Sequence, residues 1–283
     1  MSTRTAADSV TGARYVEQIT ALDSDRRARA AFVSLVMRLS SPGATVFDFG
    51  AGPGLDARLY AERGYLVAAY DVDPRMCEFF ADHCREFIEE GRITLSCGSY
   101  QDFLARDTSG INRSADLITS NFAPLNLIED LRPLFAKFHR ITSPGGKILA
   151  SVLSPFFLGD LKYGWWWRNL PRLWRDGHYS VQGTQAAIVR RQLADYAAQS
   201  APYFTLRRVF RGFPAQAPRD VAGIDVSAGI PPSAALRLST CQFMFLLFEK
   251  RNPEALGARD SDSPRAEPAD LSHGARTSGP RSV

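Results

Sequence analysis

Residues 45–54 read Thr-Val-Phe-Asp-Phe-Gly-Ala-Gly-Pro-Gly. The first five form a short β-rich run, which closes in a cluster of glycines before a helical pattern begins near Leu55. Glycines at such a turn allow a ligand to approach the backbone closely, because no Cβ atom stands in the way. This stretch therefore predicts a strand, a ligand-binding loop and a helix in succession.

Strand-like and helix-like segments alternate on both sides of this stretch. Apolar residues at helical spacing predict a helix before the glycine loop, and Asp73-Pro74 opens another after it, with the aspartate as N-cap. This alternation predicts βαβ units and therefore an α/β fold with a doubly wound, mostly parallel, Rossmann-like sheet. The predicted strands are 45–49, 65–70, 92–96, 117–120 and 147–153, and the predicted helices include 23–39, 55–63 and 131–141.

The alternation ends after Ser154. A helix is predicted from Gln182 to about Gln199, followed by two strands at 203–213 and 241–250. Because a loop rather than a helix joins these two strands, we expect an antiparallel strand at the edge of the sheet.

Composition divides the chain into three parts. Residues 1–22 show no periodicity and are expected to be a flexible lead, and 23–251 are expected to form one domain, with 155–180 as an aromatic-rich cap insertion. Residues 252–283 contain Pro, Ser, Gly, Ala and balanced charge, with almost no large apolar residue. Such a segment buries too little surface to offset its ordering entropy, so we expect a disordered tail.

A second acidic position follows the glycine loop. Asp71 ends the predicted second strand, nineteen residues after Gly52. Ligands bind at the carboxyl ends of the strands in open α/β sheets, and a carboxylate there can accept hydrogen bonds from both hydroxyls of a ribose. The sequence therefore predicts a nucleoside-binding site.

The glycine spacing narrows the kind of nucleoside site. It is Gly-x-Gly-x-Gly, not the Gly-x-Gly-x-x-Gly of nicotinamide and flavin binders, and an acid stands two positions before the first glycine. In this the sequence resembles the class I S-adenosylmethionine-dependent methyltransferases. The resemblance implies S-adenosylmethionine as cofactor, with Asp71 on the ribose and Val72 against the adenine. It also assigns cofactor binding to Asp48, Gly50, Ala51, Gly52 and Gly54.

Two later segments extend the resemblance. Relatives carry an acid after the glycine of Cys97-Gly98, where this chain has Ser99, so the adenine contact would come from Ser99, the backbone at Tyr100, or Asp102. Asn121 and Phe122 match the segment that faces the transferable methyl group. This segment reads Asn-Phe-Ala-Pro rather than Asn-Pro-Pro-Tyr, which argues against DNA, RNA and release-factor substrates.

The insertion at 155–180 contains all four tryptophans. A helical wheel places Trp166 and Trp174 on one face and three arginines on the opposite face. Three interpretations remain open: the aromatics cover the edge of the core, they cap an apolar or aromatic substrate, or they form an interfacial membrane segment. We favour the cap, with Trp166, Trp174 and Tyr179 in it and His178 as candidate general base.

The overall composition argues against several classes of protein. A net charge of +4 is too small for a dedicated nucleic-acid binder, and the four cysteines form no Cys-x-x-Cys pair, so no metal site is expected. No apolar run is long enough for a membrane span, and the first residues lack the pattern of a signal peptide, so we expect a cytoplasmic protein.

The sequence therefore favours a transferase that methylates an oxygen, nitrogen or carbon atom of a small molecule in biosynthetic metabolism. In-line transfer from a sulfonium needs alignment and exclusion of water, and needs a base only if the acceptor loses a proton. Two alternatives are a nicotinamide-dependent oxidoreductase on a similar sheet and a methyltransferase-like scaffold without turnover.

Overall fold

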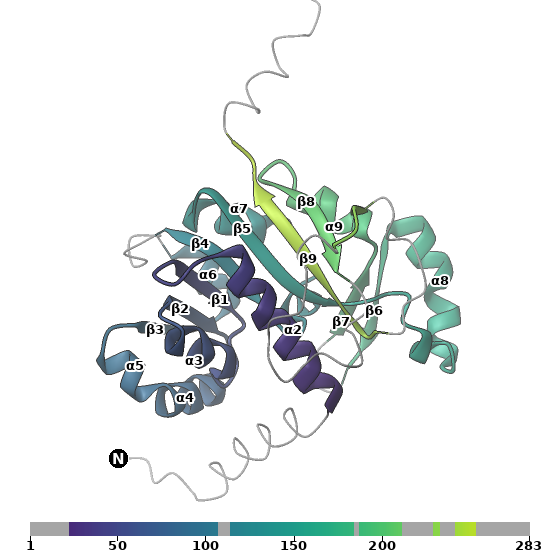
Figure 1. Ribbon diagram of the computed structural model, residues 1–283. Coiled ribbons are helices and arrows are strands. Elements are labelled where there is room, and N and C mark those ends of the chain that lie inside the picture. Colours follow the sequence, from purple (N-terminus) through teal and green to yellow (C-terminus); the bar gives the residue numbers. More distant parts are fainter. Residues whose placement is uncertain (1–22, 107–113, 184–186, 211–228, 233–240, 253–283) are drawn as a thin grey trace, which may run out of the picture. The chain divides into compact units, whose positions relative to one another are not determined.

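The central feature of the computed structural model is a seven-stranded sheet of order β3-β2-β1-β4-β5-β9-β8 (Figure 1). The structure describes residues 23–106, 114–183, 187–210, 229–232 and 241–252, so the expectations for 1–22 and for almost all of 252–283 fall outside it. The strands are β1 (Thr45–Phe49), β2 (Leu66–Asp71), β3 (Ile93–Cys97), β4 (Ala115–Ser120), β5 (Thr142–Leu153), β8 (Phe204–Phe210) and β9 (Phe243–Lys250).

The strand directions confirm the expected fold class. Strands β1 to β5 run parallel to one another, whereas β9 is antiparallel to both of its neighbours, β5 and β8. The antiparallel pair β8–β9 thus lies at one edge of the sheet. The edge strand is β8, and β9, which runs opposite to the other strands, is second from the edge. Parallel strands point their carboxyl ends to the same edge, which is where a ligand site is expected.

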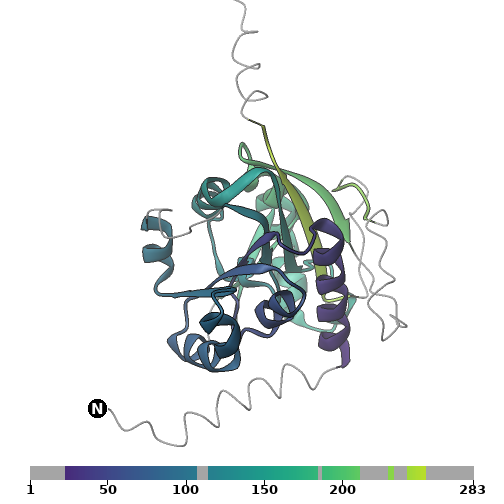
Figure 2. The same cartoon turned by 60° about the vertical axis from the view of Figure 1, so that its left-hand side comes forward.

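Helices cover both faces of the sheet (Figures 1 and 2). On one face, α6 (Tyr100–Ala105), α7 (Arg132–Ile141) and α9 (Leu193–Ser200) contribute to a buried cluster that contains Phe47. On the other, α2 (Asp23–Leu39), α3 (Leu55–Glu62), α4 (Pro74–His83) and α5 (Arg85–Glu89) contribute to a cluster that contains Val46. Consecutive residues of β1 therefore serve opposite cores, as the pleat of a doubly covered strand requires.

The predicted helix from Gln182 to Gln199 is wrong. The segment instead contains the end of β6 (His178–Gln182), the strand β7 (Ala187–Arg191), which pairs with β6 in a separate antiparallel hairpin, and the short helix α9. Tertiary contacts explain the difference, because the buried side chain of Asn126 donates to the backbone carbonyl of Val189, an oxygen that a helix would have used internally.

Beyond the sheet, α8 (Gly164–Asp176) packs against β6 with a small core of its own. Phe156, Trp166, Leu173 and Tyr179 form this satellite cluster, and Gly177 ends the helix with a φ of 78°. None of the described helices is long and apolar enough to cross a membrane.

Candidate functional site

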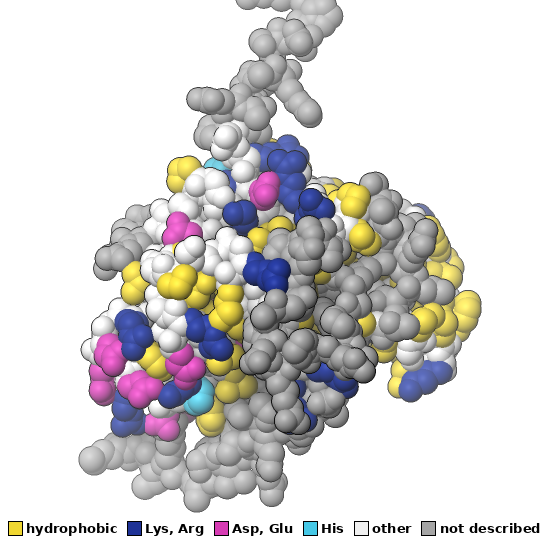
Figure 3. Space-filling view, in the orientation of Figure 1, with side chains coloured by type: hydrophobic (Ala, Val, Ile, Leu, Met, Phe, Trp, Pro, Cys, Tyr) yellow, Lys and Arg dark blue, Asp and Glu magenta, His cyan; other side chains and the backbone are white. Residues whose placement is uncertain are grey.

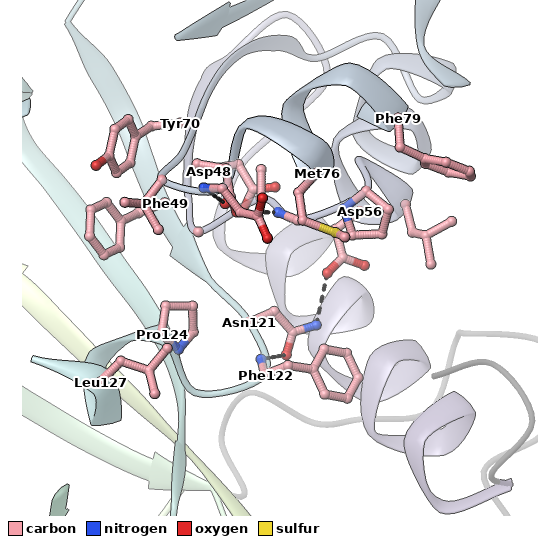
Figure 4. A pocket seen from close by; sticks show the side chains of 18 of the residues that line it. Asp48, Phe49, Asp56, Tyr70, Met76, Phe79, Asn121, Phe122, Pro124 and Leu127 are labelled. Carbon is pink, nitrogen blue, oxygen red and sulfur yellow. Dashed lines mark hydrogen bonds between the residues drawn. The ribbon is translucent and has the colours of Figure 1, made fainter. Parts of the chain in front are cut away.

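A large cavity of about 1580 Å³ opens at the carboxyl ends of β1, β2 and β4 (Figure 4). The ends of these strands and the loops that follow them supply one part of its wall, and residues of the surrounding helices supply the remainder. This is the position at which open α/β sheets bind ligands. Residues from the strand ends and loops include Asp48, Gly50, Ala51, Gly52, Asp71, Val72, Asn121, Phe122 and Pro124; Arg29, Met76 and Phe79 come from the helices, and Tyr100 from the start of α6.

The glycine loop is folded against the end of β2. The backbone amides of Gly50 and Ala51 both donate to the carbonyl of Tyr70, at 2.9 and 3.0 Å. Gly50 has a φ of 72°, and a Cβ at this position would lie 2.6 Å from Pro124. The loop after β4 therefore approaches the glycine loop so closely that only glycine fits at residue 50.

Asp71 is fixed in place by two backbone amides. Its Oδ2 accepts from the amide of Gly52 at 2.7 Å, and its Oδ1 accepts from the amide of Asp73 at 2.9 Å. Burial raises the pKa of this carboxyl group, while these backbone hydrogen bonds oppose the shift. Each oxygen keeps a further lone pair, so the oriented carboxylate is able to accept two more hydrogen bonds. The sequence predicted the carboxylate but not this orientation.

Asp48 lies beneath the glycine loop. It is 2 % exposed, and its Oδ1 accepts from the hydroxyl of Thr119 on the adjacent strand β4 at 2.8 Å. Its buried Oδ2 has no hydrogen-bond partner among the described residues. Burial, reinforced by the nearby charge of Asp56, raises the pKa of Asp48 from 3.8 to about 7. This carboxyl group thus faces the cavity with one unused oxygen, and a cationic ligand would favour its ionised form.

A network across the cavity was not predicted from the sequence. Arg29, on α2, forms a salt bridge with Asp56, on α3, and its guanidinium lies 4.6 Å from the ring centroid of Phe122. Asp56 also accepts from the side-chain amide of Asn121 at 2.9 Å, and Asn121 accepts from the amide of Phe122 (Figure 4). The position of Asp56, two residues after Gly54, was the available signal, whereas nothing local indicated Arg29.

The segment after β4 forms the opposite wall. Phe122 and Ala123 have φ values of 59° and 68°, a conformation that non-glycine residues adopt at a cost. The short helix η2 (Pro124–Leu127) follows, and Leu127, 57 % exposed, contributes to the cavity lining. The amide of Phe122 donates to the side-chain oxygen of Asn121 and the amide of Ala123 donates to the carbonyl of Ser151, and these hydrogen bonds help to hold both residues in this conformation.

The wall is anchored by a fully buried arginine. Arg191, on β7, is 0 % exposed and donates to the carbonyls of Leu125, Ile128 and Glu129. Its Nε lies 3.3 Å from a carboxylate oxygen of Asp195. The hairpin therefore supports the cavity without lining it.

Comparison with known proteins agrees with this geometry. Residues 46–146 match the family model described as a methyltransferase domain. This part of the chain is therefore similar to a methyltransferase domain.

Relatives of the methyltransferase domain have different named activities. A malonyl-[acyl-carrier protein] O-methyltransferase of Serratia marcescens is 28% identical over 134 residues, 46% of this chain and 47% of that protein. A demethylmenaquinone methyltransferase of Tropheryma whipplei is 28% identical over 142 residues, 46% of this chain and 52% of that protein. The chain thus spans about half the length of the curated relatives it matches.

A solved structure extends the likeness over most of the chain. It is a 1,6-didemethyltoxoflavin-N1-methyltransferase of Burkholderia thailandensis, with a TM-score of 0.52 and 16% identity, covering 89% of this chain and 94% of that one. At this identity the likeness shows a shared fold.

Most of the expected cofactor residues of the methyltransferase domain line the cavity, but two do not. Gly54 precedes α3 and does not line the cavity; a Cβ at this position would lie 2.7 Å from Phe80. Ser99 caps α6 by accepting from the amide of Asp102, and it also donates to that carboxylate. Tyr100 does line the cavity, and its buried hydroxyl has no partner among the described residues.

The structure does not bring the expected cap residues to the cavity. Trp166 and Tyr179 are buried in the satellite cluster, and Trp174 is 59 % exposed. His178 lies 3.5 Å from Asp195 at the start of β6. None of these four belongs to the cavity lining among the described residues. The helical wheel was right that the two tryptophans lie on a helix, α8, but Tyr179 lies on β6, and α8 packs against this strand.

Proposed function

We propose that this protein transfers a methyl group from S-adenosylmethionine to a small-molecule acceptor. The observation that carries the proposal is Asp71, held by the amides of Gly52 and Asp73 beside a glycine loop at the carboxyl edge of the sheet. A matched methyltransferase domain over residues 46–146 supports the same assignment.

The residues present fit this cofactor. Gly50 and Gly52 have no side chains, so a ligand in the cavity can approach their backbone closely. Asp48 has a buried oxygen, and Tyr100 a buried hydroxyl, without a hydrogen-bond partner among the described residues. When bound, S-adenosylmethionine supplies a methyl group on a sulfonium, which an acceptor displaces in line. We assign the ribose hydroxyls to Asp71 and the cationic part of the cofactor to the side of the cavity at Asp48.

The remaining side chains would orient the acceptor and exclude water. The cavity of about 1580 Å³ exceeds the range of about 300–1,000 Å³ typical for a single small ligand, which leaves room for an acceptor beside the cofactor. Its apolar lining includes Met76, Phe79, Phe122 and Leu127. We therefore propose an apolar or aromatic acceptor, held against Phe122 by a wall whose conformation Arg191 fixes.

Ligand-dependent melting tests the cofactor assignment. S-adenosylmethionine or S-adenosylhomocysteine should stabilise the full chain by about 2.7 kcal/mol at a hundredfold excess over the dissociation constant, and NAD should have no effect. Stabilisation by NAD alone would favour the nicotinamide-dependent alternative.

Turnover distinguishes an enzyme from a scaffold. We expect mass spectrometry to detect an isotopically labelled methyl group on an acceptor from a panel of small molecules and carrier-bound acyl groups. The panel should begin with the compounds that the relatives' names contain, demethylmenaquinone and malonyl-[acyl-carrier protein]. Cofactor binding without transfer to any acceptor would favour the scaffold.

A further inference from the structure

Large apolar side chains are exposed in two places among the described residues. Val72 and Leu127 line the cavity, where the proposed ligands would cover them. The others lie in or just before α8, which packs against β6, and none of them lines the cavity. They are Leu158, Tyr163, Trp167 and Trp174, which are 38%, 44%, 57% and 59% exposed. This second group has no covering ligand in the proposed function.

The exposed residues of α8 form two parallel rows. Trp167, Pro171 and Trp174 are spaced at i, i+4 and i+7, so they follow one face of the helix. Arg168, Arg172 and Arg175 repeat this spacing one residue later and are also exposed. We call these two rows the α8 ridge. Each aromatic or proline residue thus has an arginine beside it, and hydrophobic and basic side chains meet at the right of Figure 3, over α8.

The charge of the α8 ridge is mostly uncompensated. Arg175 forms a salt bridge with Asp176, but neither Arg168 nor Arg172 forms one with any residue that the structure describes. Lys162, just before the helix, adds a further exposed positive charge. Asp160 is buried and paired with Arg190, and its charge also attracts Lys162, so it leaves Arg168 and Arg172 without a salt bridge. The ridge is therefore complementary to an anionic surface.

The packing of α8 fixes which residues face outward. Trp166 and Leu173 occupy the satellite cluster, and the indole of Trp166 donates to the carbonyl of Pro155 at 2.9 Å. The indole of Trp167 donates to the carbonyl of Leu161, so its ring remains exposed with its polar group already satisfied. An exposed apolar ring without an unmet polar group is suited to an apolar environment.

We propose that the α8 ridge docks this protein onto an anionic lipid bilayer, with the tryptophans at the acyl boundary and the arginines among the headgroups. Amphipathic helices with Trp on one face and Arg on the polar face bind membrane interfaces in this way. A single outward helix presents a convex ridge, which suits a flat bilayer better than the concave site that an acidic protein segment would need. This contact goes beyond the proposed transfer reaction and does not depend on it.

Vesicle binding tests the ridge directly. The full chain should co-sediment with vesicles of phosphatidylcholine and phosphatidylglycerol at physiological salt, and not with phosphatidylcholine alone. Arg172→Glu should lower the partition coefficient at least about fivefold, equivalent to about 1 kcal/mol for the lost charge. Arg140→Glu is the matched control, because Arg140 is an exposed arginine on α7. The double variant Trp167→Ala/Trp174→Ala should lower partitioning about tenfold or more.

Tryptophan fluorescence gives a second readout, since all four tryptophans of the chain lie in α8. Anionic vesicles should shift the emission of the wild type to shorter wavelength and leave that of the double variant unchanged. Three results would overturn the proposal. These are no binding to anionic vesicles at physiological salt, binding that both ridge variants retain, and a dimer in solution that the ridge variants disperse.

Discussion

The cavity and the α8 ridge both combine aromatic side chains with charge, but they arise in different ways. The cavity is concave, and strand ends hold its polar groups through backbone hydrogen bonds, as at Asp71. The ridge is convex, and its residues face outward because the other face of α8 is buried in the satellite cluster. Residue type alone therefore does not distinguish a binding pocket from a docking surface. The distinction depends on whether the backbone or the side-chain packing fixes the geometry.

The largest expected effect separates two tryptophans that a helical wheel groups together. Trp166→Ala should lower the free energy of unfolding by about 3 kcal/mol, because the side chain is 5% exposed within the satellite cluster. Trp174→Ala should cost less than about 1 kcal/mol, since Trp174 is 59% exposed. Urea denaturation of both variants measures the difference. Equal losses would contradict the division of α8 into a buried and an exposed face.

On the cavity side, Asp71→Ala should weaken S-adenosylmethionine binding about a hundredfold, or about 2.7 kcal/mol. The variant removes the proposed ribose acceptor and leaves the amides of Gly52 and Asp73 without their partner. Isothermal titration calorimetry provides the measurement, and Glu89→Ala on α5 removes an exposed carboxylate as control. Unchanged affinity in the Asp71 variant would remove that residue from the site.

The buried carboxyl group of Asp48 predicts a pH dependence. Its pKa is raised from 3.8 to about 7, so the folded chain holds this proton more tightly than the unfolded chain. The stability it contributes is full below about pH 4 and is lost as the pH rises through about 7. Relative to Asp48→Asn, the wild type should lose at most about 1.4 kcal/mol of unfolding free energy per pH unit across this window.

Ligand binding should show the opposite trend with pH. Because a cationic ligand favours the ionised carboxylate, wild-type affinity for S-adenosylmethionine should rise from about pH 6 to about pH 8. Calorimetry of Asp48→Asn should show a weaker rise. The same pH dependence in wild type and variant would assign the titration to another group.

The smallest expected effect concerns Ser99. Ser99→Ala should cost about 1 kcal/mol of stability, because Ser99 caps α6, and should change cofactor affinity less than about twofold. Thermal melting and calorimetry measure the two quantities. A tenfold loss of affinity would instead place the serine hydroxyl in contact with the cofactor.

The two regions also differ in how much the sequence predicted. The α/β sheet and the places of Gly50 and Asp71 were predictable, because a strand, a tight turn and the next strand end fix them locally. The N-cap role of Asp73 was predictable for the same reason, and its side chain does accept from the amide of Arg75. Arg29 was not predictable, since its partner Asp56 lies 27 residues away.

The errors in and around the insertion share one physical cause. Tryptophan occupies three consecutive positions of α8, so its periodicity does not identify a buried face. The predicted helix over Gln182–Gln199 failed because Asn126, from a distant segment, binds the backbone of β7. In both cases a neighbour from elsewhere in the chain decides the outcome, and helical spacing carries no information about it.

The buried guanidinium of Arg191 has a consequence for the order in which parts of the site become available during synthesis of the chain. The carbonyls that it binds precede it by 62 to 66 residues, and β9, which lies inside the sheet, comes later still. A nascent chain that has emerged as far as Leu153 already contains the glycine loop, Asp71 and Asn121. It lacks both the anchor of the opposite wall and the strand that pairs with β5. During synthesis, the cofactor side of the cavity is therefore specified before the wall that faces it.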